Sequence, residues 1–321
     1  MKKILILKLA SLGDLVHALP ALSDAKRAHP DFVFDWALDH RFQEVASWHP
    51  AIRQVIPTNH RTWRKHPFSS KTRQEIGRVL TTLQESHYDL IIDAQGNWKT
   101  ALFSLWIPGT TIGWDGSCIP EWGAHLFYGK TVSVPSSCHA IEKMRQLFAK
   151  ALDDPLPTSA PDYQINQELF SPPPILLPSR YLVFVPIAST HQKLWPQDHW
   201  KYLLQRACEQ NLSIVIPWGS EEEKRRMEQL ILHPNITLLP SLSLSQIGYV
   251  LHKAQAIVSV DTGLSHIGAA LNIPSITLYG PTDPHKTGTV GTHQHWLSSP
   301  SSSLADIHPS SVWKALQSLL G

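Results

Sequence analysis

The chain has 321 residues, with 28 Lys and Arg against 26 Asp and Glu and only three cysteines. This length is large for one typical domain and suits two, each able to bury a core. A net charge of +2 produces no global field that would require nucleic acid as a partner. Cys118, Cys138 and Cys208 are odd in number and widely spaced, which argues against a disulfide framework and fits a reducing cytoplasm. No run of about 18 apolar residues occurs, and the apolar run at 4–7 is too short for a signal peptide.

The first half alternates between predicted strands and predicted helices. Apolar runs predict strands at residues 2–8, 32–38, 53–57 and 88–94, and amphipathic spacing predicts helices from about 15 to 28, over 75–86 and over 139–152. Such alternation predicts a parallel sheet covered by helices, because parallel strands need helical crossovers.

Asp14 lies at the entrance of the first of these helices, directly after the first strand and a small-residue loop. Ligands of open α/β sheets collect beyond the carboxyl ends of the strands, so we expect Asp14 to project into a cleft. The alternative is that Asp14 only caps the helix. Neither G-x-G-x-x-G after this strand nor G-x-x-x-x-G-K-[ST] occurs, which argues against a dinucleotide dehydrogenase and a P-loop NTPase.

A proline-rich segment separates the two halves. Seven prolines crowd residues 153–179, which show little periodicity and are typical of a connection between domains. We predict a first domain over 1–154, a linker over 155–178, a second domain over 179–305 and a C-terminal helix over 306–321. That last helix can pack on either half, including back on the first domain.

The second half repeats the alternation, and residues 259–284 are its most informative part. Strands are predicted at 181–187, 212–219, 236–239 and 256–260, with helices over 199–210, 221–232 and 264–271, and a further strand is predicted after the last of these helices, within 259–284. Asp261, Thr262 and Gly263 make the turn between the last of these strands and its helix. Two such domains are expected to face each other across a cleft, with Asp14 on one wall and the Asp261 turn on the other, which suits transfer between two substrates.

The Asp261 turn has the features of an anion site. Free backbone N–H groups are expected at Gly263, Leu264 and Ser265, and the positive end of the helix dipole favours an anion there. His266 is one turn along and can donate to a phosphate, or it can be an ordinary satisfied helix histidine. The alternative for the whole turn is that Asp261 or Thr262 caps an ordinary helix.

Two other strand ends supply polar groups. After the strand at 181–187, Ser189 and Thr190 carry hydroxyls and Lys193 carries a cation, which would stabilise the charge that grows on a departing diphosphate. The alternative is a solvated surface lysine. After the strand at 212–219, Glu221 can accept hydrogen bonds from ribose hydroxyls, or it can enrich the first turn of a helix.

Residues 45–74 contain no acidic residue but many basic ones, among them Arg61, Arg64 and Lys65. Such a patch suits phosphate or carboxylate groups on a substrate or a membrane surface, although charge runs also occur on simple solvated loops. Seven of the twelve tryptophans lie in the first 122 residues, and aromatic faces suit sugars or a lipid interface.

Motifs for other chemistries are missing from the sequence. There is no H-x-x-x-H or H-E-x-x-H, and no D-x-D in a loop after a strand, so no metal is predicted. There is also no G-x-S-x-G and no credible Cys–His pair.

The motifs together resemble the bacterial lipopolysaccharide heptosyltransferases. The matching segments span nearly the whole chain and include ILKLASLGDLVHALPAL, RTWRKHPFS, YDLIIDAQG, KLWPQDHW, IPWG and SVDTGLSHIGAALNIPSITLYGPTDP. The resemblance implies a GT-B fold, that is an α/β protein with two Rossmann-like αβα domains, and inverting transfer from ADP-L-glycero-D-manno-heptose without metal or cofactor. Within the family, the loop ASTHQKLWP favours the branch that adds the first heptose to the inner-core Kdo of Kdo2-lipid A. The branch that extends heptosyl-Kdo2-lipid A, which typically carries G-P-A-K-R-W-P there, and a GT-B-like nucleotide-sugar epimerase or hydrolase are the alternatives.

The resemblance also assigns roles to residues. It makes Asp14 the base that takes the proton from the Kdo hydroxyl, and Lys193 a catalytic and donor-binding group. The other implied donor contacts are Ser189, Glu221, Leu242 at the adenine, Asp261, Thr262, Gly263, Leu264 and His266. Arg61, Arg64 and Lys65 would bind the anionic acceptor.

The chain departs from the family pattern in two places, and the resemblance carries expectations about its partners. Ala188 and Ser189 stand where a threonine pair is common, and Pro120 lies where an arginine of the acceptor wall is expected. We further expect a cytoplasmic monomer that contacts the inner membrane peripherally and binds no nucleic acid.

Overall fold

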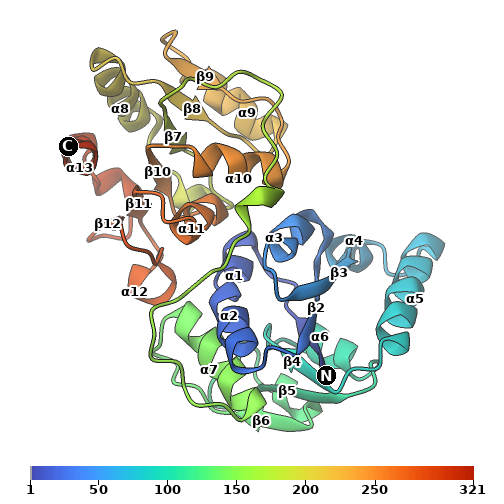
Figure 1. Ribbon diagram of the computed structural model, residues 1–321. Coiled ribbons are helices and arrows are strands. Elements are labelled where there is room, and N and C mark those ends of the chain that lie inside the picture. Colours follow the sequence, from blue (N-terminus) through green and yellow to red (C-terminus); the bar gives the residue numbers. More distant parts are fainter. Residues whose placement is uncertain (1) are drawn as a thin grey trace. The chain divides into compact units, whose positions relative to one another are not determined.

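The structure is a computed structural model, which describes residues 2–321. The chain forms two compact units, one ending at Ile165 and one comprising Asn166–Gly321. Each unit is a parallel sheet with helices on both of its faces (Figure 1), blue to green in the first unit and yellow-green to red in the second. This confirms the prediction of two Rossmann-like α/β domains. The predicted linker is shared between the units, since residues 155–165 belong to the first and residues 166–178 to the second.

The first sheet has six strands in the order β3-β2-β1-β4-β5-β6, all parallel. Leu5 of the central strand pairs with Asp35 on one side and with Ile91 on the other. Residues 4–7 are fully buried, which explains why this strand reads as a continuous apolar run. The strands are β1 (Lys3–Leu7), β2 (Val33–Asp39), β3 (Ile52–Thr58), β4 (Leu90–Asp93), β5 (Thr110–Trp114) and β6 (Lys130–Val132).

The helices of the first unit follow these strands along the chain. They are α1 (Leu12–Val16), α2 (Leu19–Ala28), α3 (Gln43–Ser47), α4 (His60–Lys65), α5 (Ser70–Glu85), α6 (Trp98–Ser104), the short 3₁₀ helix η2 (Ala124–Phe127) and α7 (Ala140–Leu152). α2 and α7 pack together beside the sheet. Their contact is reinforced by buried Arg145 of α7, which donates to Asp24 of α2 at 2.6 Å.

The second sheet has the order β12-β11-β10-β7-β8-β9, again all parallel. Counted from its own first strand, this is the order 3-2-1-4-5-6 of the first sheet, which is the order of the Rossmann fold. Its strands are β7 (Leu182–Val185), β8 (Ile214–Ile216), β9 (Ile236–Leu238), β10 (Ala256–Val260), β11 (Ser275–Tyr279) and β12 (Gln294–Ser298). The helices of the second unit are α8 (Gln197–Glu209), α9 (Glu221–Glu228), α10 (Leu244–His252), α11 (Gly263–Ala270), α12 (Pro284–Thr287) and α13 (Pro309–Leu320). A 3₁₀ turn, η4 (His191–Lys193), follows β7.

Several elements differ from the sequence predictions. Strands β5, β6 and β12 and helices α3, α4, α6, α10 and α12 were not predicted, because each is short, with nine residues or fewer. α5 begins five residues earlier than predicted because Ser69 accepts from the Thr72 N–H and caps it there. The C-terminal helix α13 packs against α8 and the strands β10 and β11 of the second unit. Among residues 2–321, no helix is long and apolar enough to cross a membrane.

Candidate functional site

Asp14 belongs to the first turn of α1, at the carboxyl end of the central strand β1. Helix α1 starts earlier than predicted, and its N-cap is Ser11 rather than Asp14. The Ser11 hydroxyl donates to Asp14 Oδ2 at 2.7 Å, and the Ser11 N–H lies 3.3 Å from the same oxygen. This reciprocal cap orients the carboxylate while its side chain stays half-buried.

A buried lysine and a buried aspartate lie at the same strand ends. Lys8 follows β1, is only 6% exposed, and donates from Nζ to the Ala94 carbonyl at 3.0 Å. Burial lowers the pKa of Lys8, and the negative charges of Asp14 and Asp93 oppose that shift. Asp93 ends β4 and accepts from the Tyr128 hydroxyl at 2.8 Å. Burial raises the pKa of Asp93, and its hydrogen bonds work against that rise. Strands β1 and β4 are the pair at which the strand order reverses, which is where ligands of such sheets bind.

The predicted basic patch is organised around one buried carboxylate. Asp39 ends β2 and is 2% exposed; Arg41 donates to it from Nε and from a terminal nitrogen at 3.0 and 2.9 Å. Arg61 Nε of α4 lies 3.3 Å from Asp39 Oδ2. Burial alone would raise the pKa of Asp39, but the hydrogen bonds from Arg41 outweigh it and lower this pKa. The carboxylate therefore stays ionised and fixes both guanidinium groups.

Arg64 and Lys65 lie exposed at the end of α4, on the same short helix as Arg61. Trp63 Nε1 donates to Glu75 of α5 at 2.8 Å and so holds α4 against its neighbour. The three predicted acceptor residues are thus brought together on one helix that follows the carboxyl end of β3.

In the second unit, the predicted donor residues follow the carboxyl ends of four adjacent strands. Ser189 follows β7 and is exposed; Glu221 is the first residue of α9 after β8; Leu242 follows β9; and Asp261 follows β10. The order β9-β8-β7-β10 places these four ends side by side along one edge of the sheet. The reversal of strand order lies between β7 and β10, the strands that precede Ser189 and Asp261.

Asp261 is the centre of this edge. Lys193 Nζ lies 2.6 Å from Asp261 Oδ2, and His266 Nε2 lies 3.6 Å from Oδ1. Burial alone would raise the pKa of Asp261, but hydrogen bonds from His266, Lys193 and Thr282 outweigh it and hold this pKa well below its usual range. Lys193 is thus not a freely solvated surface lysine, because a buried carboxylate fixes its ammonium at the edge.

The N-terminus of α11 begins directly after this carboxylate. Thr262 is its N-cap in extended conformation, and Gly263 and Leu264 are its first two residues, whose N–H groups have no acceptor within the helix. The Ser265 N–H, expected to be free, instead donates to the Thr262 carbonyl at 3.1 Å. Two of the three predicted backbone donors therefore remain for an anion.

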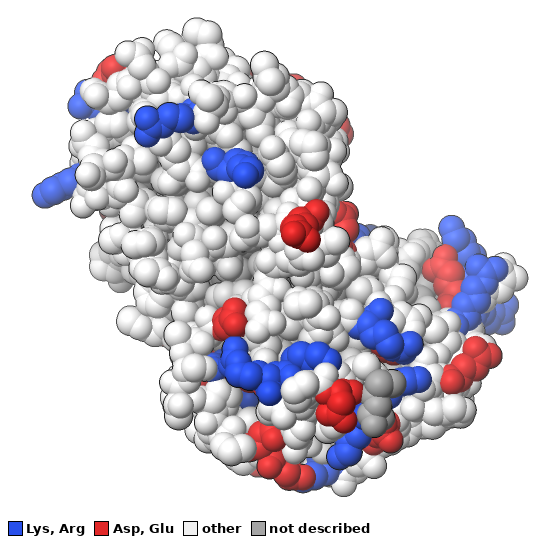
Figure 2. All heavy atoms as spheres, in the orientation of Figure 1, with Lys and Arg blue, Asp and Glu red and all other residues white. Residues whose placement is uncertain are grey.

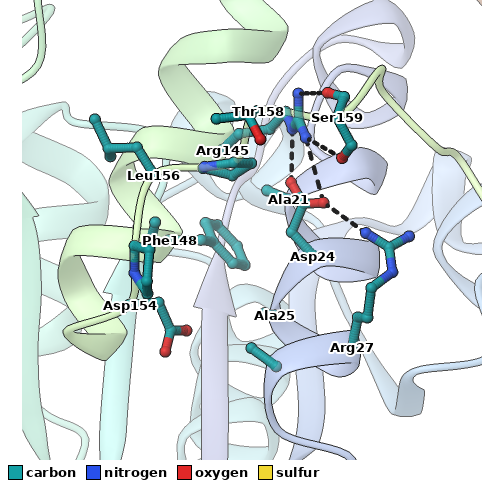
Figure 3. Close-up of a pocket in the computed structure, with 14 residues that line it drawn as sticks. Ala21, Asp24, Ala25, Arg27, Arg145, Phe148, Asp154, Leu156, Thr158 and Ser159 are labelled. Carbon is teal, nitrogen blue, oxygen red and sulfur yellow. Dashed lines mark hydrogen bonds and ion pairs between the residues drawn. The ribbon is translucent and has the colours of Figure 1, made fainter.

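A separate cavity of about 410 Å³ lies in the first unit between α2, α7 and residues 154–159. Figure 3 shows Arg145 reaching across it to Asp24 and to Ser159, while Arg27 also points to Asp24. These charged groups form ion pairs and hydrogen bonds with their neighbours. None of the predicted site residues lines the cavity. Its contacts tie the start of the proline-rich segment to the first unit.

Sequence reasoning missed Lys8, Asp39, Arg41, Asp93 and Tyr128. A signal was present for three of them, because the apolar strands β2 and β4 end in a charged residue and the apolar strand β1 is followed directly by one. Tyr128 and Arg41 could not be found this way, since their contacts depend on the folded loops. Within residues 2–321, no three or more His, Cys, Asp or Glu side chains are grouped so as to hold a metal ion.

Comparison with known proteins identifies the family. Residues 76–316 match the model of glycosyltransferase family 9 (heptosyltransferase). The chain belongs to glycosyltransferase family 9. It is 42% identical to lipopolysaccharide heptosyltransferase 1 of Pseudomonas aeruginosa over 92% of this chain and 84% of that protein, and 38% identical to the Escherichia coli K12 protein of that name over 99% and 100%.

Solved structures agree with this family assignment. The structure of E. coli heptosyltransferase WaaC with ADP covers 99% of each chain at 36% identity, with a TM-score of 0.92. The same enzyme with ADP-2-deoxy-2-fluoro heptose matches over 98% of this chain and 99% of that one, with a TM-score of 0.90. The predicted family and GT-B fold are confirmed, and this family 9 member is a glycosyltransferase.

Proposed function

We propose that the protein is an inverting glycosyltransferase that moves L-glycero-D-manno-heptose from ADP-heptose to the inner-core Kdo of Kdo2-lipid A, in the synthesis of the lipopolysaccharide core. The relatives named above are heptosyltransferases, and one of them was solved with ADP and with a fluorinated ADP-heptose. The observation that carries the proposal is the pairing of Lys193 with buried Asp261 at the start of α11. It holds a cation beside a helix N-terminus, the arrangement that a diphosphate requires.

The donor would lie along the carboxyl edge of the second sheet. The Gly263 and Leu264 amides, the Ser189 and Thr262 hydroxyls and the Lys193 ammonium would bind the diphosphate, and Glu221 would accept from the ribose hydroxyls. The remaining donor contacts would be Leu242 at the adenine, and Asp261 and His266 at the sugar and diphosphate. Because Lys193 is already fixed, its charge would meet the negative charge that develops on ADP without reorganisation.

Asp14 would be the general base. Its carboxylate would take the proton from the Kdo hydroxyl while that oxygen forms a bond to the anomeric carbon of heptose, and ADP would leave with the electron pair of the broken bond. The Ser11 hydroxyl and N–H hold the carboxylate in place. No metal or other cofactor takes part in this proposal.

Arg61, Arg64 and Lys65 would bind the anionic acceptor. Arg61 is pinned by Asp39, whereas Arg64 and Lys65 are exposed and can reach a ligand. Since the acceptor carries acyl chains, we also propose that a monomer works peripherally on the cytoplasmic face of the inner membrane.

The test is ADP release from ADP-heptose with and without Kdo2-lipid A. Release that requires the acceptor supports the proposal. Release without acceptor would favour the alternative of a nucleotide-sugar hydrolase or epimerase. Release only with heptosyl-Kdo2-lipid A would favour the branch of the family that adds the second heptose.

A further inference from the structure

Helix α6 carries large apolar side chains on a face that is exposed to solvent. Helices of globular proteins normally turn their apolar stripe to the core. In α6 the core-facing residues are Thr100, Ala101 and Ser104. Trp98 and Leu102, four residues apart on the opposite face, are 41% and 44% exposed, and Leu105 continues the stripe at 58%. The helix thus presents Trp98 and Leu102, followed by Leu105, to solvent, whereas Phe103 is partly buried against the core.

The segment around η2 extends the same apolar surface. Trp122 and Leu126 are 75% and 70% exposed. The ring of Trp98 meets that of Phe127 edge-on at 5.4 Å, and a Cβ on Gly123 would come within 2.7 Å of the Trp98 ring. We call the surface formed by Trp98, Leu102, Leu105, Trp122 and Leu126 the α6–η2 patch. Single exposed apolar residues are ordinary, but a contiguous group of this kind marks an interaction surface.

Basic residues border the α6–η2 patch. Lys99 is exposed within α6 itself. The neighbouring α5 is tied to the end of α6 by Gln84, which donates to the Trp106 carbonyl at 2.9 Å. α5 and the adjoining α4 carry the exposed cations Arg61, Arg64, Lys65, Lys71, Arg73 and Arg78. Figure 2 shows Lys and Arg side chains gathering over α5.

We propose that the α6–η2 patch inserts into the interfacial region of a bilayer, while the cations of α4 and α5 contact anionic headgroups. Tryptophan and leucine beside Lys and Arg are the composition of interfacial membrane-binding surfaces. The exposed lysines beside the patch, Lys65, Lys71 and Lys99, favour a bilayer over a second copy or another protein, because protein–protein interfaces are depleted in Lys. This inference rests on the proposed function, because a lipid-bearing acceptor is what brings the enzyme to a membrane.

The position of the patch in the fold suits this role. α6 follows the carboxyl end of β4, η2 follows β5, and α4 follows β3, so all three arise at the edge of the sheet that also carries Asp14 after β1. Contact of this edge with the bilayer would bring the proposed base to the level of the lipid headgroups, where the Kdo sugars emerge.

The test is co-sedimentation of the full chain with vesicles of phosphatidylethanolamine and phosphatidylglycerol, compared with vesicles of phosphatidylcholine alone. We expect binding to the anionic vesicles that falls with salt. The variant Leu105→Ser/Leu126→Ser is expected to bind them at least about tenfold more weakly, since each leucine loses the benefit of burial. The matched control is Leu176→Ser/Leu232→Ser, two leucines exposed at 97% and 68% in the second unit, which should bind like the unaltered protein.

Two outcomes would overturn the inference. Undiminished vesicle binding by Leu105→Ser/Leu126→Ser would exclude the α6–η2 patch as the contact. A lipid-free dimer in analytical ultracentrifugation that this variant abolishes would assign the patch to a second copy of the chain.

Measurements of ADP release test this inference separately from the proposed function. The Leu105→Ser/Leu126→Ser variant should release ADP normally with a deacylated, water-soluble Kdo acceptor and more slowly with acceptor embedded in vesicles. Equal slowing with both acceptors would contradict the inference. If the unaltered protein released no ADP with either acceptor, the proposed function would fail while the vesicle-binding result would still stand.

Discussion

Lys193 and Asp261 form an ion pair of 2.6 Å between the loop after β7 and the turn after β10. Asp261 is 8% exposed and also meets His266. A buried carboxylate with a depressed pKa therefore holds a lysine at the reversal of strand order in the second sheet.

The Lys193→Met variant should lose both activity and stability. We expect kcat to fall roughly 10²–10³-fold, because the charge on the departing diphosphate is no longer met. Asp261 is left without its cation, which should lower the free energy of unfolding by about 1–3 kcal/mol. Chemical denaturation and the ADP-release rate measure the two effects.

A second variant separates the effect of Lys193 on kcat from its effect on stability. Lys193→Met/Asp261→Asn removes the unpaired charge, so it should recover much of the lost stability without recovering kcat. Recovery of both would show that Lys193 acts only by supporting the fold.

The Asp14→Asn variant should bind the donor normally but lose most of its transferase activity. Removal of a general base typically lowers kcat by about 10²–10⁴-fold. Donor affinity, measured by calorimetry with ADP, should be unchanged, because the proposed donor residues all lie in the second unit. Asp31→Asn, at an exposed aspartate of the same unit, is the control. Normal turnover by Asp14→Asn would remove Asp14 from the mechanism.

The Arg64→Gln/Lys65→Gln variant should raise the KM for the acceptor and leave the KM for ADP-heptose unchanged. Both side chains are exposed on α4 and form no ion pair within the described part of the chain, so the fold should be unaffected. The loss should shrink as salt is raised, since screening weakens the same attraction in the unaltered protein. Arg225→Gln on the second unit is the control, and an altered donor KM would argue against the assigned role.

Metal removal should leave the rate unchanged. In the proposed mechanism Lys193 and the N-terminus of α11 balance the charge of the diphosphate. Initial rates after treatment with EDTA should therefore equal those before it. A rate lost with EDTA and restored by a divalent cation would show that a metal shares this role.

The burial of His49 leads us to predict that the protein loses stability in mild acid. It is fully buried, with Nε2 2.9 Å from the Ser23 hydroxyl and Nδ1 accepting from the Ala51 N–H, and burial lowers its pKa to about 4. An unfolded histidine titrates near 6.5, so between these pH values the unfolded chain binds a proton that the folded chain does not. Stability should therefore fall by about 3 kcal/mol as pH drops from about 6.5 to 4.

Urea denaturation across that pH range checks the prediction. His49→Gln should flatten the pH dependence, whatever its effect on stability at pH 7. His293→Gln, at an exposed histidine, should keep it. An unchanged slope in His49→Gln would assign the acid sensitivity to other groups.

The alternation of apolar runs with helical periods sufficed to predict both Rossmann-like sheets, because strands such as β1 and β10 are buried on both faces and read as continuous apolar segments. Two of the strands at the sheet edges, β6 and β12, gave no such signal. β12 reads QHWLS and β6 has only three residues, so their pairing depends on the neighbouring strand rather than on their own composition.

The site was predictable where a residue's place depends on its own strand end, and not where it depends on distant partners. Asp261 and Ser189 could be placed from the turns that follow β10 and β7. The ion pair between Lys193 and Asp261 joins residues 68 positions apart, and that between Arg61 and Asp39 joins residues on different strand ends. Such pairs follow from the order of strands in the sheet, which local sequence does not determine.

The most direct test of the central claim is the mass of the acceptor after incubation with ADP-heptose. The proposed function predicts that Kdo2-lipid A gains one heptose residue with the unaltered protein, and that Asp14→Asn converts only a small fraction of the acceptor in the same time. A Kdo2-lipid A of unchanged mass, under conditions in which ADP is released, would contradict heptosyl transfer to this acceptor.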